Sequence, residues 1–255
     1  MFKSTKAKSD SLYGHLEELR RTLLASLLAV FLGAVFCYVF FLGFLTDILL
    51  CPIQSLGKDL VFIGVGEGFI THIKIAFLGG MIISSPVILW ELLKYISPAL
   101  YRNEKRTLYI ALFCSTLLLI IGIVFAYCCI LPVALKMLLV NLSFGLTPMI
   151  SIGAYVSFLF WFLLPFGLIF ETPLAVYFLS KIGLVTPNLL VAKRKNIIFA
   201  LFVLAAILTP TPDIITQLLM AVPMLILYQI SVWISKWVAW SKKKKNEKLA
   251  EERAV

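Results

Sequence analysis

Long apolar runs separated by short polar segments dominate the chain, and their lengths predict its fold. A helix needs about 20 consecutive apolar residues to cross the hydrocarbon of a bilayer, and several runs reach that length. The pattern predicts six helical spans, at 23–44, 73–93, 108–131, 155–179, 196–208 and 214–232. The expected fold class is therefore an all-α polytopic membrane protein.

The predicted fifth span is unusually short. At about 1.5 Å per residue, 196–208 reaches only about 20 Å, against a hydrocarbon thickness of about 30 Å. One interpretation is a hairpin that other helices shield or beside which the bilayer thins. The other is a longer helix that begins near Pro187 and carries Lys193 and Lys195 at the headgroups.

Composition and charge agree with a membrane protein and add an orientation. Hydrophobic residues make up 61% of the chain, mean hydropathy is +1.00, and 14% of residues are charged, against about 25% in soluble proteins. Of the 23 Lys and Arg, all but Lys58, Lys74 and Lys136 fall on one side of the predicted spans. This bias places both termini in the cytoplasm, and it accounts for the net charge of +10 without a nucleic-acid partner.

The ends of the chain differ in pattern from the apolar centre. Leu12, Leu16, Leu19 and Leu23 recur at helical spacing among charged residues, which predicts an amphipathic helix at the cytoplasmic interface. We therefore expect an amphipathic amino-terminal segment at 1–22. A transmembrane domain would follow at 23–238, and a charged cytoplasmic tail at 239–255.

The two outer connections, 46–71 and 136–153, mix Gly and Pro with apolar residues, so we expect short helices there. Prolines also lie within or beside the spans, where each removes a helical hydrogen bond and favours a bend. They are Pro86, Pro132, Pro165, Pro173 and Pro223. Bent spans leaning together favour a concave wall over a tight parallel bundle.

Candidate chemistry is sparse. The five cysteines form no CxxC pair, and four lie in apolar runs, which is typical of small core residues. The two histidines, His15 and His72, are too far apart in sequence to indicate a metal site. No nucleotide-binding loop or catalytic triad is evident, so we expect neither an enzyme nor a cofactor.

One carboxylate, Glu171, lies deep in an apolar run, within the stretch FGLIFETPLAV. Counted from Gly167, it is about 6 Å from the midplane of its span. A charge at that depth costs about 3 kcal/mol or more, so we expect Glu171 to face protein or trapped water. A functional role is one interpretation, and a hydrogen bond that packs two helices is the other.

The remaining polar positions have local explanations as well as functional ones. Glu17 can pair with Arg20 and Arg21, or Glu18 with Arg21, along one helix, and Glu104 lies in a charged turn. Asp213 can cap the sixth span, and Gln217, one turn later, can pair with another span.

Taken in order, these stretches resemble the TatC family, the large membrane subunit of the twin-arginine protein translocase. The resemblance covers roughly residues 11–240 and rests on HLEELRRTLL, SSPVILWELLKYISPALYRNEKR, GIVFAYCCILPVAL, LIFETPLAVYFL and LTPTPDIITQLLMAVPMLILYQI. It implies six spans, cytoplasmic termini, a concave glove-like arrangement and no enzymatic activity. It also implies a multi-pass protein of the bacterial cytoplasmic membrane.

The resemblance also implies residue roles and partners. Glu18 and Glu104 match signal-peptide-recognition positions, with Arg20 and Tyr95 beside them. Glu171 and Gln217 match intramembrane polar and partner-contact positions, and structural or functional positions are matched by Pro52, Pro86 and Asp213. The implied partners are TatA-type and TatB-type subunits, twin-arginine signal peptides of folded cargo, the lipid bilayer and further copies of the chain.

Two other classes of function stay open at this stage. A proton- or solute-coupled carrier would use Glu171 as its coupling acid, although the sequence shows no internal repeat. A structural scaffold would bind no ligand. Solute uptake by proteoliposomes would favour the carrier, and failure to crosslink a twin-arginine peptide would favour the scaffold.

Overall fold

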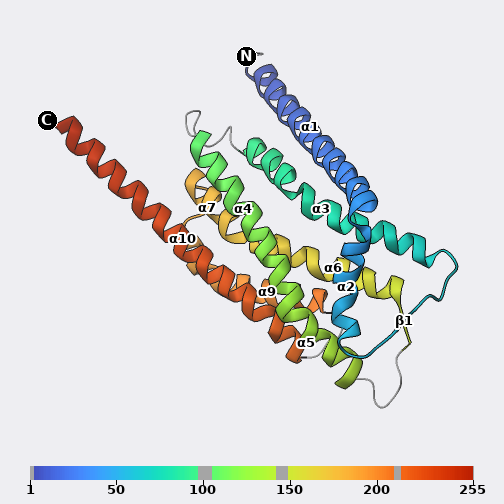
Figure 1. The fold of residues 1–255 in the computed structure, drawn as a ribbon. Helices are drawn as coiled ribbons and strands as arrows, with labels where there is room; N and C mark the ends of the chain where they lie inside the picture. Colours follow the sequence, from blue (N-terminus) through green and yellow to red (C-terminus); the bar gives the residue numbers. More distant parts are fainter. Residues whose placement is uncertain (1–2, 97–104, 142–148, 210–213, 255) are drawn as a thin grey trace. The chain divides into compact units, whose positions relative to one another are not determined.

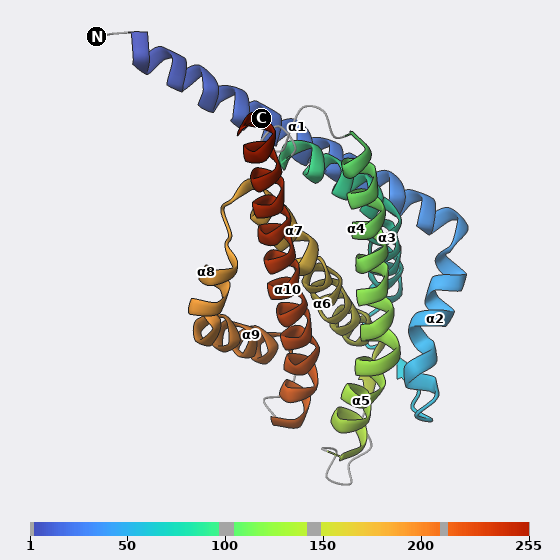
Figure 2. The same ribbon diagram turned by 90° about the vertical axis from the view of Figure 1, so that its left-hand side faces the viewer.

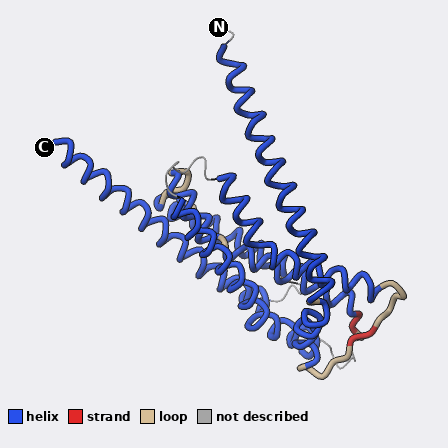
Figure 3. Tube along the Cα trace, turned by 45° about the horizontal axis from the view of Figure 1, so that its top comes forward, coloured by secondary structure: helices blue, strands red, loops and turns tan. Residues whose placement is uncertain are grey.

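The computed structural model describes residues 3–96, 105–141, 149–209 and 214–254. These residues are almost entirely helical (Figures 1 and 3). They form two compact units. Unit 1 comprises 1–49 and 62–116, and unit 2 comprises 50–61 and 117–255.

Unit 1 is built on the contact between α1 (Lys3–Phe40) and α3 (Glu67–Ile96). The helices are antiparallel, because Ala29 accepts a hydrogen bond from Ser84 Oγ at 2.6 Å while Ala34, further along α1, meets Gly80, earlier in α3. A Cβ on Gly80 would lie 2.6 Å from Ala34 Cα, so the backbones approach as closely as small residues permit.

The amphipathic segment and the first span form one unbroken helix. α1 runs through Thr22 and Leu23 without interruption and ends at Phe40. α2 (Leu42–Gln54) follows after a single turn residue. Phe44, the predicted end of the first span, therefore lies inside α2. Exposed Leu and Phe side chains cover much of α1, as expected of a surface that faces lipid.

Unit 2 contains the carboxyl-terminal helices. α6 (Ile152–Phe170) is followed by α7 (Thr172–Ile182), α8 (Pro187–Ala192), α9 (Arg194–Leu208) and α10 (Ile214–Ala254) (Figure 2). Leu190, Tyr228 and Val232 form a buried cluster. Val176, Val185, Ile197 and Leu201 pack against this cluster. It therefore joins α7, α8, α9 and α10.

The cluster is fixed by a hydrogen bond and by well-formed helix ends. Tyr228 donates its hydroxyl to the Leu190 carbonyl at 2.8 Å. Gly183, at φ +96°, ends α7, and Thr186 begins α8 by accepting the Leu189 N–H. These two ends produce the sharp connection between the helices.

The outer connections contain the predicted short helices together with strands that the sequence did not predict. α2 lies in the first, and α5 (Leu131–Lys136) enters the second, flanked by π-helical turns η2 (Ala126–Ile130) and η3 (Met137–Asn141). β1 (Leu60–Val61) pairs in parallel with β2 (Ile150–Ser151). A two-residue pairing leaves no alternating pattern in the sequence, so the all-α prediction overlooked it.

Five helical stretches among the described residues are long and apolar enough to cross a membrane. They are Glu17–Phe40, Glu67–Lys94, Tyr109–Leu139, Ile152–Ile182 and Ile214–Lys244. α4 (Lys105–Phe125) begins the third of them. The predicted fifth span corresponds to α9, whose 15 residues extend only about 22 Å. A continuous helix from Pro187 is wrong, because Lys193 separates α8 from α9.

The core role predicted for the cysteines is correct only for Cys37. Cys114 is half-buried, and Cys51, Cys128 and Cys129 are exposed; all five are free thiols. In an apolar span an exposed position still meets hydrocarbon, so hydropathy cannot separate a residue that faces lipid from one that faces protein.

Gly80→Ala tests the close contact of α1 with α3. The new methyl group would overlap Ala34, so we expect a loss of about 1–3 kcal/mol in unfolding free energy in detergent. Gly43→Ala is the matched control, since no atom lies within 4 Å of the added methyl group. Equal unfolding temperatures for the two variants would contradict the close packing.

Candidate functional site

The first candidate site lies in the amino-terminal half of α1. Glu18 and Arg20 are both exposed there. At 100° per residue, Arg20 lies about 200° around the helix from Glu18, and Arg21 lies about 60° from it. The Glu18 carboxylate therefore projects from a different face of α1 than the Arg20 guanidinium.

The packing of α1 against α3 decides what shares this end of unit 1. Ala29 pairs with Ser84, and Gly33 packs against Gly80. Because the two helices are antiparallel, residues nearer the amino end of α1 lie beside residues nearer the carboxyl end of α3. Continued to Glu18, this register places the Tyr95 backbone at the same level. Only the backbone of Tyr95 is described, and Glu104 lies outside the described residues.

Two contacts support this end of unit 1 and were not predicted from the sequence. Trp90 of α3 stacks on Tyr109 of α4, with ring centroids 5.3 Å apart and planes at 28°. Lys94 Nζ lies 3.9 Å from Glu91 Oε1. The stack holds α3 and α4 together beside the connection that carries Glu104. The sequence signal for this stack was an aromatic residue on each side of the charged turn.

The second candidate site is the junction of α6 and α7 in unit 2. Glu171 is the single residue between the two helices, a one-residue turn within the apolar stretch Ile152–Ile182. Its N–H bonds to the Leu168 carbonyl at 3.1 Å, and its carbonyl accepts the Ala175 N–H at 2.9 Å. Pro173, in the first turn of α7, has no N–H to continue the ladder, so the break falls beside the acid.

Glu171 faces protein, as its depth in the span requires. The residue is half-buried, and its Oε1 is shielded from solvent. The neighbouring Phe170 ring lies 5.7 Å from the Phe125 ring, and a Cβ on Gly122 would come within 2.7 Å of Phe170. The tight packing of Phe170 against the third span holds the junction in place.

The third candidate position is Gln217 on α10. It is half-buried, and its Nε2 donates to the Phe202 carbonyl of α9 at 3.2 Å. The predicted pairing with another span is therefore present within unit 2. Asp213, predicted to cap this helix, lies outside the described residues.

The two structural prolines lie inside helices. Pro52 is buried within α2, where its carbonyl accepts the Ser55 hydroxyl at 2.7 Å. Pro86 is half-buried within α3, after Ser84 and Ser85. Ser85 Oγ bonds to the Ile82 carbonyl at 2.7 Å, so a serine hydroxyl lies next to the helical ladder that Pro86 interrupts.

Other polar contacts in unit 2 were also missed. Ser180 of α7 and Ser235 of α10 share a buried hydrogen bond of 2.9 Å. Lys242 Nζ donates to the Ser180 carbonyl at 3.1 Å. A single Ser or Lys at the end of an apolar run gives no indication of its partner, so the pairing is visible only in three dimensions.

The structure thus brings together some of the predicted residues and separates others. Glu18 and Tyr95 share one end of unit 1. Glu171 and Gln217 lie in unit 2, on different elements. No described histidine, cysteine, aspartate or glutamate takes part in a group that could hold a metal ion.

The comparisons with known proteins decide the family. The family model "Sec-independent protein translocase protein (TatC)" matches residues 14–223. The TatC protein of Carboxydothermus hydrogenoformans is 42% identical over 234 residues, which cover 91% of this chain and 95% of that protein. The chain belongs to the TatC family.

Other TatC proteins extend the match. The protein of Aquifex aeolicus is 40% identical over 239 residues, covering 92% of this chain and 98% of its own. A crystal structure titled "Twin Arginine Translocase Receptor- TatC" matches with a TM-score of 0.78 and 39% identity. That match covers 88% of this chain and 99% of the crystallised one.

Membership of the TatC family establishes the class of protein. The chain is a component of the Sec-independent protein translocase, a transport protein and not an enzyme. It is a multi-pass protein of the bacterial cytoplasmic membrane, in agreement with its apolar spans. The resemblance read from the sequence motifs is confirmed.

Gln217→Leu tests whether the hydrogen bond between α9 and α10 holds the short helix. Loss of one net hydrogen bond should lower the unfolding free energy by about 1 kcal/mol. α9 should also become more accessible to proteolysis. Gln229→Leu, on the same helix, is the control for a Gln-to-Leu change. Unchanged stability and unchanged cleavage of α9 would contradict a structural role for this bond.

Proposed function

We propose that this TatC-family chain is the core receptor of a twin-arginine translocase. It binds twin-arginine signal peptides of folded cargo on its cytoplasmic side. It then organises TatA-type and TatB-type subunits for export driven by the proton-motive force. The observation that carries the proposal is the exposed Glu18 on α1, at the level of the carboxyl end of α3.

The proposed topology has six spans and both termini in the cytoplasm. Its support is the distribution of Lys and Arg, of which only Lys58, Lys74 and Lys136 fall on the outer side. The sixth crossing requires α9 to span, and its length of about 22 Å fits a locally thinned bilayer. A concave, glove-like arrangement is part of the same proposal, and its support is the family match.

The chemistry of a twin-arginine ligand suits this end of unit 1. Two adjacent guanidinium groups need planar carboxylate acceptors, because pairing of arginine with a carboxylate is bidentate and directional. Glu18 is exposed on α1, and Glu104 directly precedes the first residue of α4. Each acid takes one guanidinium.

Arg21 lies about 60° around α1 from Glu18 and is the basic residue that an incoming guanidinium has to displace; the other basic residues nearby leave the acids open to this role. Arg20 projects from a different face of α1, where it can meet lipid phosphates at the edge of the site. Lys94 lies beside Glu91, which offsets its charge. Tyr95, at the end of α3, completes the proposed binding surface. The acids are therefore the groups available to an incoming cation.

Glu171 and Gln217 serve a different step. Glu171 is buried too deep in its span to meet a headgroup-level arginine pair, and it lies where the helix is broken. We assign Glu171 and Gln217 to contacts with the apolar part of the signal peptide or with partner membrane helices. Pro52, Pro86 and Asp213 keep the helices in shape, and further copies of the chain associate in the same assembly.

Crosslinking to a twin-arginine peptide tests the receptor role. Glu18→Ala or Glu104→Ala should reduce crosslinking about tenfold or more, since charge-assisted hydrogen bonds contribute about 1.5–3 kcal/mol each. A twin-lysine peptide is the ligand control. Glu17→Ala is the matched protein control, because its side chain lies about 100° away on the same helix. Unchanged crosslinking in the double variant Glu18→Ala/Glu104→Ala would overturn the proposed site.

Glu171→Ala tests whether Glu171 acts in contacts within the membrane and not in recognition of the arginine pair. Peptide crosslinking should stay within about twofold of wild type, because the arginine pair does not reach the middle of the span. Export of folded cargo and crosslinking to TatA-type or TatB-type partners should fall. Thr172→Ala, one residue later, is the control for local damage to the junction. The assignment fails if peptide recognition is lost while partner crosslinks persist.

A further inference from the structure

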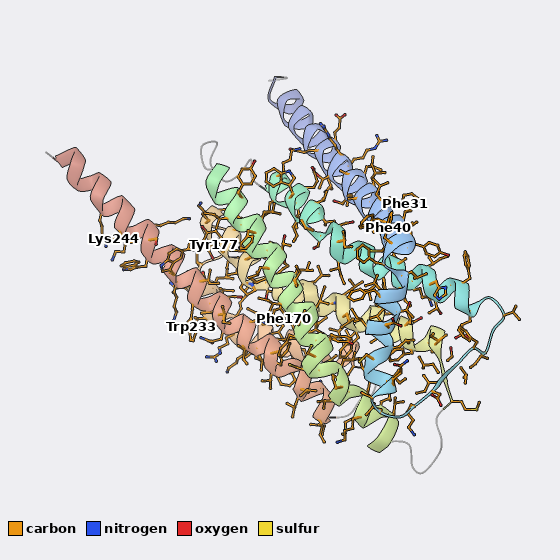
Figure 4. All side chains as sticks on the ribbon, in the orientation of Figure 1. Phe31, Phe40, Phe170, Tyr177, Trp233 and Lys244 are labelled. Carbon is orange, nitrogen blue, oxygen red and sulfur yellow. The ribbon has the colours of Figure 1, made fainter. Side chains whose placement is uncertain are left out.

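The face of α10 that points away from unit 2 is aliphatic in its amino-terminal part and aromatic further along. Ile215, Val222 and Ile226 are at least half exposed on this face. Trp233, Trp237 and Trp240 continue it, each about 60% exposed. Their spacings of seven, four, seven, four and three residues keep them on one side of a helix with 3.6 residues per turn. Figure 4 shows Trp233 and Lys244 on the same side of α10.

The opposite face of α10 is packed against its own unit. Ser231, Ser235 and Val238 are buried there, and Lys242 donates to the Ser180 carbonyl. The tryptophan face is therefore not needed for the internal contacts of unit 2. It offers a row of large aromatic side chains to whatever surrounds the helix.

The order of residues on this face matches the layers of a bilayer. From Ile215 to Trp233 the helix rises about 27 Å, close to the thickness of the hydrocarbon. Tryptophan prefers the boundary between hydrocarbon and headgroups, and lysine prefers the phosphates beyond it. Lys244 Nζ lies 5.2 Å from the Trp240 ring centroid, so the cation is held at the end of the aromatic row.

Lys236 is also exposed, about 60° around the helix from Trp233. We propose that Trp233, Trp237, Trp240, Lys236 and Lys244 form a binding surface for anionic phospholipid. The indole rings lie among the upper acyl chains and glycerol groups, and the two ammonium groups contact the phosphate. The surface fixes the depth of α10 and, through the same rigid helix, the depth of Gln217. Lipid is favoured over a protein helix because a partner helix in the membrane would face an aliphatic surface and would not require this order of residues.

The surface requires only that α10 crosses the membrane. It does not depend on the receptor proposal, since none of its residues belongs to the proposed peptide site. Loss of lipid binding with normal peptide crosslinking, or the reverse, would separate the two proposals.

Quenching of tryptophan fluorescence by brominated lipid tests the proposal. Trp90→Phe and Trp161→Phe together leave only the three tryptophans of this surface among the five in the chain. The full chain is reconstituted in vesicles of phosphatidylcholine with phosphatidylglycerol. Bromine is placed on the acyl chains of one lipid or the other at equal total content. Brominated phosphatidylglycerol should quench more strongly, and about 1 M salt should remove the difference.

Two lysine variants on one helix make the test specific. Lys244→Gln should weaken the preference for phosphatidylglycerol about fivefold, the effect expected of one basic residue near an anionic surface. Lys242→Gln removes the same charge on the packed side and should leave the preference unchanged. Both variants are checked for wild-type helicity and detergent extraction.

Equal quenching by the two lipids, or equal effects of the two lysine variants, would overturn the proposal. Absence of quenching by either lipid would also overturn it, because it would mean that a protein covers the face. Dilution of the chain in the vesicles would then test for a second copy of α10 as the covering partner.

Discussion

The bilayer imposes one requirement on this chain: each backbone N–H and carbonyl at membrane depth needs a partner within the protein. Long helices meet that requirement by themselves, and they account for nearly all described residues. The departures from regular helix then become informative. The parallel strands lie in the outer connections, whereas the junction at Glu171 lies within a span, where a break has to be supported by surrounding helices.

The two units solve helix packing in different ways. In unit 1, Gly33 and Gly80 let two backbones approach closely, so dispersion contacts and the Ser84–Ala29 hydrogen bond hold α1 to α3. In unit 2, polar side chains link helices through buried bonds, as with Tyr228 and Leu190. Neither kind of packing relies on the hydrophobic effect between spans. Lipid tails are as apolar as the helix surfaces, so moving a surface from lipid to protein gains no hydrophobic free energy.

The polar groups of this TatC-family chain divide by depth, and depth separates their chemistry. Glu18 of unit 1 is exposed, and in the receptor proposal its carboxylate meets a cationic ligand. A carboxylate within α6–α7 requires protein around it and is suited to contacts inside the membrane. In the lipid-binding proposal, the tryptophan and lysine residues of α10 hold that helix at a defined height in the bilayer.

The amino-acid sequence by itself determined the helical class and the family, since hydropathy, spacing and motif order are properties of the chain alone. It also indicated that 196–208 is too short for an ordinary span, which the 15 residues of α9 support. Tertiary structure decided which apolar residues face protein, as the exposed Cys128 and buried Cys37 show. It also decided that Gln217 meets Phe202 and that β1 meets β2. Such pairings join segments that are distant in sequence, and no local sequence pattern specifies which distant segments meet.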